Sequence, residues 1–127
     1  MKPEPQSDHA ALEGVWSIVK AEFAAEEMPA LVAQKTELEL SAGSYVVRFG
    51  GRPADRGSYL LGAVGPHRSM ILNGIEGPNT GRTIPAIYQL VGDRLRICYG
   101  IDGQTPGSFA TTTGSQLYLV TYRRKTP

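Results

Sequence analysis

Residues 12–16 read LEGVW, and the tryptophan at their end leads into a long apolar segment, VWSIVKAEF at 15–23. The last apolar segment of the chain, SQLYLVTYRR at 115–124, ends on two arginines. If these two segments pair with each other, a sheet that begins with one and ends with the other has no exposed edge. We therefore expect the first and last strands to close the sheet into a barrel.

Between these two segments the apolar residues recur with a period of two, as in strands that bury one face. KTELELS at 35–41 places Leu38 and Leu40 on one face and Glu37 and Glu39 on the other, solvated face. Short turns join the segments, which favours an antiparallel meander. The sequence predicts eight strands, at residues 15–23, 35–41, 44–50, 58–64, 69–75, 83–91, 94–100 and 115–124.

The predicted fold class is all-β, an eight-stranded antiparallel up-and-down barrel, with a sandwich as the alternative. AAEEMPALVAQ at 24–34 is richer in alanine and glutamate, and its proline predicts one short helix near residues 28–34 that covers one mouth of the barrel. GRPADRG at 51–57 is interpreted as a turn. At 127 residues the chain forms one domain, which we place at residues 11–125, after a disordered tail at 1–10.

The composition does not point to a strongly charged partner. The chain has 13 Lys plus Arg and 12 Asp plus Glu, a formal net charge of +1, so we expect neither nucleic acid nor a membrane surface as a partner. The first residues lack the apolar core of a signal peptide, and a single cysteine allows no internal disulfide. As written, the protein is expected in the cytoplasm, as a monomer or weak homodimer. An exported precursor with its leader removed is the alternative.

No motif assigns catalytic, metal or cofactor chemistry. GPNTGRT at 77–83 is one residue too short between its glycines for a phosphate-binding loop, so a rigid hairpin loop is the preferred interpretation. His9, His67 and Cys98 are too dispersed to predict a metal site. We interpret Cys98 as a buried packing thiol and assign no catalytic residue, metal or cofactor.

Three segments resemble an uncharacterised bacterial domain family that is abundant in planctomycete-type genomes and regarded as lipocalin-like. These are LEGVWSIVKAEF at 12–23, EGPNTGRTIPAIYQLVGDRLRICYG at 76–100 and LYLVTYRR at 117–124. The chain departs from the family pattern at Asn73, where an acidic residue is common, and at Thr105, where an arginine usually precedes the proline. The resemblance implies a small calycin-type barrel and no established activity.

The resemblance also implies a structural role for the Gly-x-Trp. In lipocalin-type barrels Gly14 would permit a tight entry, and the indole of Trp16 would plug one end. An arginine of the last strand would then pack on the indole face, a cation–π contact worth roughly 0.5–2 kcal/mol. Alternation along the strand lets only one of Arg123 and Arg124 face inward.

The tyrosines suggest where a ligand could bind. All six lie on predicted strands, and inward tyrosines combine apolar walls with fixed polar groups, as ligand pockets do. The residues that we predict to line such a cavity are Tyr45, Phe49, Tyr88, Leu90 and Tyr99. The alternative is that side chains simply fill a barrel of this size.

Three hypotheses for function follow. The first is a module that binds a hydrophobic, apolar or aromatic small molecule, with the helix near Pro29 as a lid. The second is a protein–protein interaction domain with a filled core. The third is a barrel enzyme of the cyclase or isomerase type, which encloses its substrate and needs only shape and one or two tyrosines.

Overall fold

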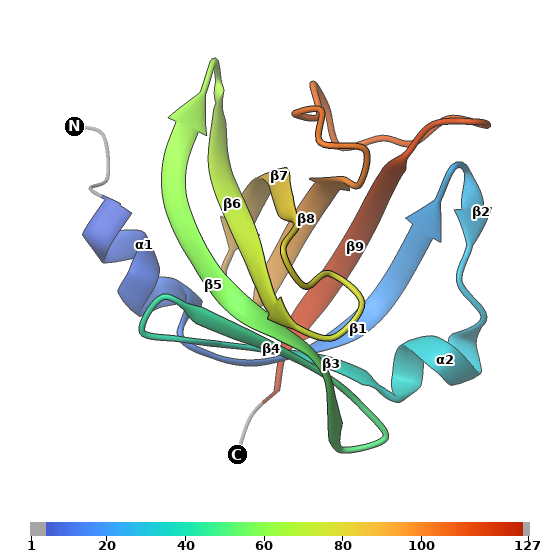
Figure 1. Cartoon of the computed structure of the whole chain (residues 1–127), viewed down its shortest axis with the longest axis horizontal. Helices are drawn as coiled ribbons and strands as arrows, with labels where there is room; N and C mark the ends of the chain where they lie inside the picture. Colours follow the sequence, from blue (N-terminus) through green and yellow to red (C-terminus); the bar gives the residue numbers. More distant parts are fainter. Residues whose placement is uncertain (1–4, 126–127) are drawn as a thin grey trace.

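The computed structural model describes residues 5–125, and their architecture is a closed barrel of eight antiparallel strands (Figure 1). The strands of the barrel follow one another around it in chain order. They are β1 (Gly14–Phe23), β3 (Thr36–Ser41), β4 (Ser44–Phe49), β5 (Arg52–Val64), β6 (His67–Glu76), β7 (Thr83–Val91), β8 (Arg94–Gly100) and β9 (Leu117–Arg124). A two-residue strand, β2 (Glu26–Glu27), pairs antiparallel with the last two residues of β1. The predicted fold class is confirmed.

The first and last strands pair along most of their length, which closes the barrel. Trp16 lies opposite Arg124 and Phe23 lies opposite Tyr118, with one bulge between Ile18 and Lys20. Figure 1 shows β1 and β9 side by side. Because every strand of the barrel has two neighbours, no long edge is left to pair with another molecule.

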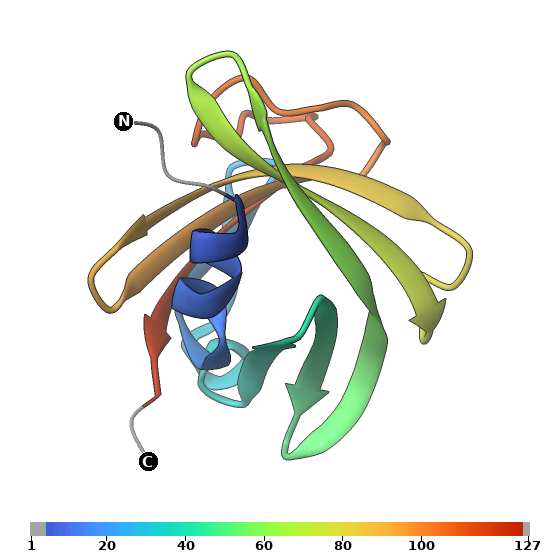
Figure 2. The ribbon, with the colours of Figure 1, turned by 90° about the vertical axis from the view of Figure 1, so that its left-hand side faces the viewer.

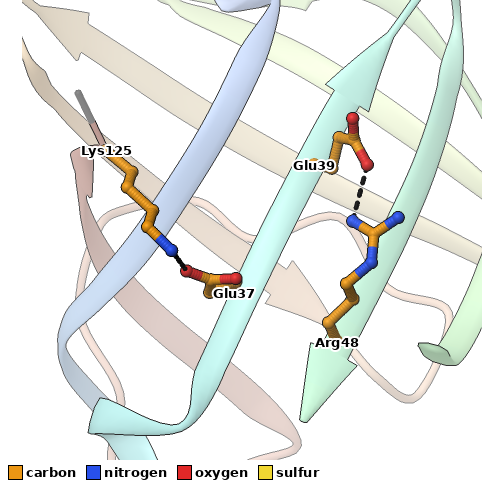
Figure 3. A network of polar contacts seen from close by, with 4 residues as sticks. All are labelled: Glu37, Glu39, Arg48 and Lys125. Carbon is orange, nitrogen blue, oxygen red and sulfur yellow. Dashed lines mark hydrogen bonds and ion pairs between the residues drawn. The ribbon is translucent and has the colours of Figure 1, made fainter. Parts of the chain in front are cut away.

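The alternation of the strands separates an apolar interior from a charged exterior. Leu38 and Leu40 are buried inside the barrel, as the period of two predicts. Glu37 and Glu39 point outward and form ion pairs with Lys125 and Arg48, at 2.6 and 2.5 Å (Figure 3). The sheet therefore has one face for the core and one for solvent.

The predicted short helix is confirmed as α2 (Ala30–Gln34), which begins directly after Pro29. The proline fixes a backbone angle that suits the start of a helix and gives up no hydrogen bond there. Ala33 is the one buried residue of α2, whereas Leu31 is exposed. With a single buried alanine, α2 packs only a small apolar surface against β1.

A second helix, α1 (Pro5–Leu12), occupies part of the segment that was predicted as a disordered tail, so that prediction is wrong for residues 5–10. Residues 1–4 lie outside the described part of the chain. In Figure 2 α1 stands in front of the strands at one end of the barrel, which we call the α1 end. The helix is held by tertiary contacts, because Leu12 is fully buried and Asp8 is only 7% exposed.

The stretch at 51–57 belongs to β5 and is not the turn that the sequence predicted. Two glycines with positive φ, Gly50 and Gly51, make the turn, and the strand begins at Arg52. A shift in register after Val47 lets β5 pair with β4 across the proline at position 53. The pairing of β5 with β4 places Asp55 opposite Val47, on the wall of the barrel.

The long loop between β8 and β9 crosses the outside of the barrel. Phe109, at its middle, packs edge-on against His67, at 5.5 Å between ring centres, and beneath the guanidinium of Arg96, at 4.4 Å. Under this loop Ile87 and Cys98 face each other on β7 and β8, and both are fully buried. Cys98 is thus a buried thiol, as predicted, but on the outer face of the sheet.

Neither helix that the structure describes is long and apolar enough to span a membrane.

Candidate functional site

The α1 end of the barrel is closed by Trp16, whose side chain is 0% exposed. Its indole nitrogen donates a hydrogen bond to the carbonyl of Leu12, at 3.0 Å. The guanidinium of Arg124, not that of Arg123, lies over the indole at 4.3 Å and donates to the carbonyls of Ala11 and Glu13. Arg124 therefore donates hydrogen bonds to backbone carbonyls at the C-terminal end of α1 and packs on the indole that closes the barrel.

Gly14 is required at this entry for two reasons. Its φ of +131° is one that residues with a side chain rarely adopt. A Cβ at this position would also come within 3.1 Å of the Arg124 guanidinium. Gly14, Trp16 and Arg124 form a structural unit that holds the first strand, the last strand and α1 together.

Asp8 fastens α1 to the barrel from inside the α1 end. Its carboxylate accepts hydrogen bonds from the Tyr88 hydroxyl, at 2.5 Å, and from Arg68, at 2.9 and 3.0 Å. Burial and the neighbouring Asp8 raise the pKa of Tyr88 well above its usual range. His9 stacks on the ring of Tyr59, with 5.4 Å between ring centres. These contacts hold α1 against the barrel and give Asp8 and the Tyr88 hydroxyl partners within the fold.

A cavity of about 170 Å³ lies toward the opposite end of the barrel, where β3 begins and the loop between β6 and β7 turns. The cavity is partly open, and its walls are mostly apolar and aromatic. Its lining residues are Ile18, Thr36, Glu37, Leu38, Tyr45, Val47, Asp55, Leu72, Asn79, Ile84, Tyr99, Ile101, Tyr118 and Tyr122. They come from all eight barrel strands and from two loops, so closure of the barrel creates the cavity.

Four tyrosines give the cavity its aromatic character. The rings of Tyr99 and Tyr118, on paired strands, stack with 5.7 Å between their centres. The hydroxyls of Tyr99 and Tyr122 share a hydrogen bond of 2.8 Å. Burial raises the pKa of both these hydroxyls well above the usual range, so they stay protonated at any physiological pH. The hydroxyls of Tyr99 and Tyr122 are therefore engaged with each other, and their rings remain as the part that a ligand can contact.

The polar part of the wall is built around Asp55. Its Oδ2 accepts a hydrogen bond from the Asn79 side-chain amide, at 2.8 Å, and lies 3.5 Å from the Tyr45 hydroxyl. Its Oδ1 is buried and has no hydrogen-bond partner among the residues that the structure describes. Burial and then the charge of Asp55 raise the pKa of Tyr45 to about 12. The cavity wall thus carries a partly paired carboxylate, Asp55, among mostly apolar side chains.

A glycine allows the loop between β6 and β7 to approach Asp55 closely. Gly77 has a positive φ of 95°, and a Cβ there would come within 2.5 Å of the Ala54 carbonyl and 2.9 Å of Asp55 Oδ1. This packing brings Asn79 within reach of the carboxylate. The loop at 77–83 therefore serves as part of the cavity wall.

The structure divides the residues that were predicted to line a cavity. Tyr45 and Tyr99 lie together in its wall. Phe49 shares the face of Tyr45 but is 46% exposed, because β4 ends there and the chain turns away. Tyr88 and Leu90 face the interior at the α1 end, where Tyr88 binds Asp8, and they do not line this cavity. The helix α2, predicted as a lid, contributes no lining residue either.

Two polar lining residues, Asp55 and Asn79, were not predicted from the sequence. Asp55 was hidden in a stretch that was interpreted as a turn, and Asn79 in a loop judged only for phosphate binding. Tyr118 and Tyr122 were recognised as strand residues, and their spacing of four places them on one face of β9. That spacing could have identified both as inward.

Other chemistry lacks a matching arrangement in the described part of the chain. Residues 5–125 contain no group of three His, Cys, Asp or Glu side chains that could hold a metal ion. Burial raises the pKa of the Cys98 thiol, which disfavours the reactive thiolate. Comparisons with protein-family models, curated proteins and solved structures find no match for the chain.

Proposed function

We propose that the protein is a lipocalin-like binding module that holds a small apolar or aromatic molecule in the cavity between Tyr45, Leu72 and Tyr99. The observation that carries this proposal is the cavity itself: about 170 Å³ of space with mainly apolar and aromatic walls inside a closed barrel. Pockets for small molecules combine such walls with a few fixed polar groups. Asp55 and Asn79 supply those groups here.

The volume limits the ligand to a compact molecule. An apolar cavity of about 150 Å³ in a protein core is large enough to bind benzene. The cavity therefore suits a molecule built on one ring, with a short substituent that reaches the polar wall. A long acyl chain or a fused multi-ring ligand would require the walls to move.

The test is a thermal-shift measurement with benzyl alcohol, which fits the volume and carries no charge. A ligand at a hundredfold its dissociation constant adds about 2.7 kcal/mol to the stability of the folded state. We expect a concentration-dependent rise in Tm for the unsubstituted protein. We expect the rise to disappear in Val47→Phe, because Val47 lines the cavity and a larger side chain would fill it.

Val46→Phe is the matched control. Val46 lies next to Val47 on β4, but it pairs with Glu39 on the outward face and does not line the cavity. This variant should keep the full rise in Tm. Equal rises in Val46→Phe and Val47→Phe would show that benzyl alcohol binds elsewhere.

A second candidate function, contact with another protein, is supported by apolar side chains on the outside of the barrel. Leu60 is 64% exposed and lies opposite Ile71, which is also exposed. Exposed apolar neighbours of this kind often mark interaction surfaces. Leu60→Lys should abolish any self-association seen by analytical ultracentrifugation; a strictly monomeric unsubstituted protein would speak against contact between copies of this chain.

A further inference from the structure

We propose that the cavity selects small amines in their ammonium form, with Asp55 as the residue that binds the charged group and the tyrosine rings as its surroundings. This inference rests on the proposed function and adds the chemical class of the ligand. It excludes small carboxylates, whose negative charge would meet that of Asp55.

The cavity wall carries negative charge and no positive charge. The lining residues include two carboxylates, Asp55 and Glu37, and no lysine, arginine or histidine. Glu37 directs its carboxylate outward to Lys125, so the charge of the cavity wall comes from Asp55 (Figure 3). Arg82, which contacts the lining residues Asn79 and Ile101, is exposed and donates to the Asn79 side chain and the Ile101 carbonyl.

The Asp55 carboxylate is incompletely coordinated. It forms no ion pair within residues 5–125, and its one short hydrogen bond comes from the neutral amide of Asn79. A carboxylate removed from water is costly unless donors or a positive charge compensate it. An ammonium group at this wall supplies both. Burial, and after it the negative charge of Asp55, raises the pKa of the neighbouring Tyr45.

The cavity wall is rich in aromatic rings. Ring faces attract cations, and a cluster of rings is the usual setting for recognition of organic ammonium groups. Tyr99 and Tyr122 bind each other through their hydroxyls, so their rings are what remains for a ligand. Tyr118 stacks beside Tyr99 and extends this aromatic wall. The ligand that matches both walls has a positive amine on a compact apolar body.

Three probes of nearly equal size test the inference by isothermal titration calorimetry with the full chain at neutral pH: benzylamine, benzyl alcohol and benzoate. A hydrogen bond to a charged partner is worth roughly twice a neutral one, which predicts about tenfold tighter binding of benzylamine than of benzyl alcohol. Benzoate should bind weakest, because its carboxylate meets that of Asp55. Asp55→Asn should remove the preference, so that benzylamine and benzyl alcohol bind this variant within about twofold of each other.

Asp93→Asn is the control, because it makes the same change of charge at an exposed position at the α1 end; it should retain the preference. Binding of benzyl alcohol as tight as that of benzylamine would overturn the inference and leave the proposed function standing. Binding of none of the three probes would overturn both. If Asp55→Asn does not fold, the ranking of the three probes on the unsubstituted protein still decides.

Discussion

The guanidinium of Arg124 lies 4.3 Å from the centre of the Trp16 ring, and the two residues face each other where the first and last strands pair. The same guanidinium binds the carbonyls of Ala11 and Glu13 at the end of α1. One side chain therefore links both ends of the chain to the plug of the barrel. The cavity lies toward the opposite end of the barrel.

Arg124→Ala should lower the free energy of unfolding by about 1–3 kcal/mol, because it removes the cation–π contact and the hydrogen bonds to α1. Arg123→Ala, one position earlier and exposed, should change it by less than about 0.5 kcal/mol. Urea denaturation followed by the fluorescence of Trp16 measures both. Equal effects of the two substitutions would contradict the assignment of Arg124.

Asp8→Ala should loosen α1 without unfolding the barrel. The substitution removes the acceptor for Arg68 and Tyr88, and a buried hydrogen bond to a charged group is worth about 1.5–3 kcal/mol. Hydrogen exchange should become faster for the amides of α1 and stay unchanged in β7 and β8. Slow exchange throughout α1 in the variant would mean that Leu12 alone holds the helix.

Stability should fall at high pH. The folded-state pKa of Tyr45 is raised from 10.0 to about 12, so unfolded chains lose this proton before folded ones do. The stabilisation is complete below pH 10 and is lost as the pH rises toward 12. Tyr45→Phe should make the decline shallower over this range, by at most about 1.4 kcal/mol per pH unit. Denaturation curves across this pH range measure the effect, and an unchanged slope would contradict the burial of the Tyr45 hydroxyl.

Phe109→Ala should expose Cys98 to thiol reagents. Phe109 anchors the long loop between His67 and Arg96, and the loop covers the thiol. Loss of an anchor worth about 1.4 kcal/mol would increase the open population, and with it the labelling rate, about tenfold. Thr112→Ala, an exposed position in the same loop, is the control. Equal labelling rates would show that the loop does not depend on Phe109.

Most of the fold was predictable from the sequence because alternation is a local signal. Leu38 and Leu40 identify an inward face without knowledge of their neighbours, and the terminal segments indicate closure. The helix α1 gave no such signal, since Asp8 is buried only through partners that are distant in the sequence, Arg68 and Tyr88. The burial of Cys98 on the outer face likewise depends on a loop and not on its strand.

The candidate site was predictable only in part. Alternation places Tyr45 and Tyr99 inside the barrel, but it does not give the height of a residue along the barrel axis. Tyr88 is inward too, yet it lies at the end that α1 fills. Asp55 could not be recognised, because the register shift that places it in the wall arises from the pairing of β5 with β4.

Binding inside the barrel is tested by titrating the isotope-labelled protein with benzyl alcohol and following the amide chemical shifts by NMR. A ligand in the cavity should shift the amides of lining residues such as Val47, Leu72 and Tyr99 and leave Trp16 and Tyr88 at the α1 end unchanged. Shifts confined to the α1 end or to the outer surface, or no shifts at all, would contradict a binding cavity in the barrel.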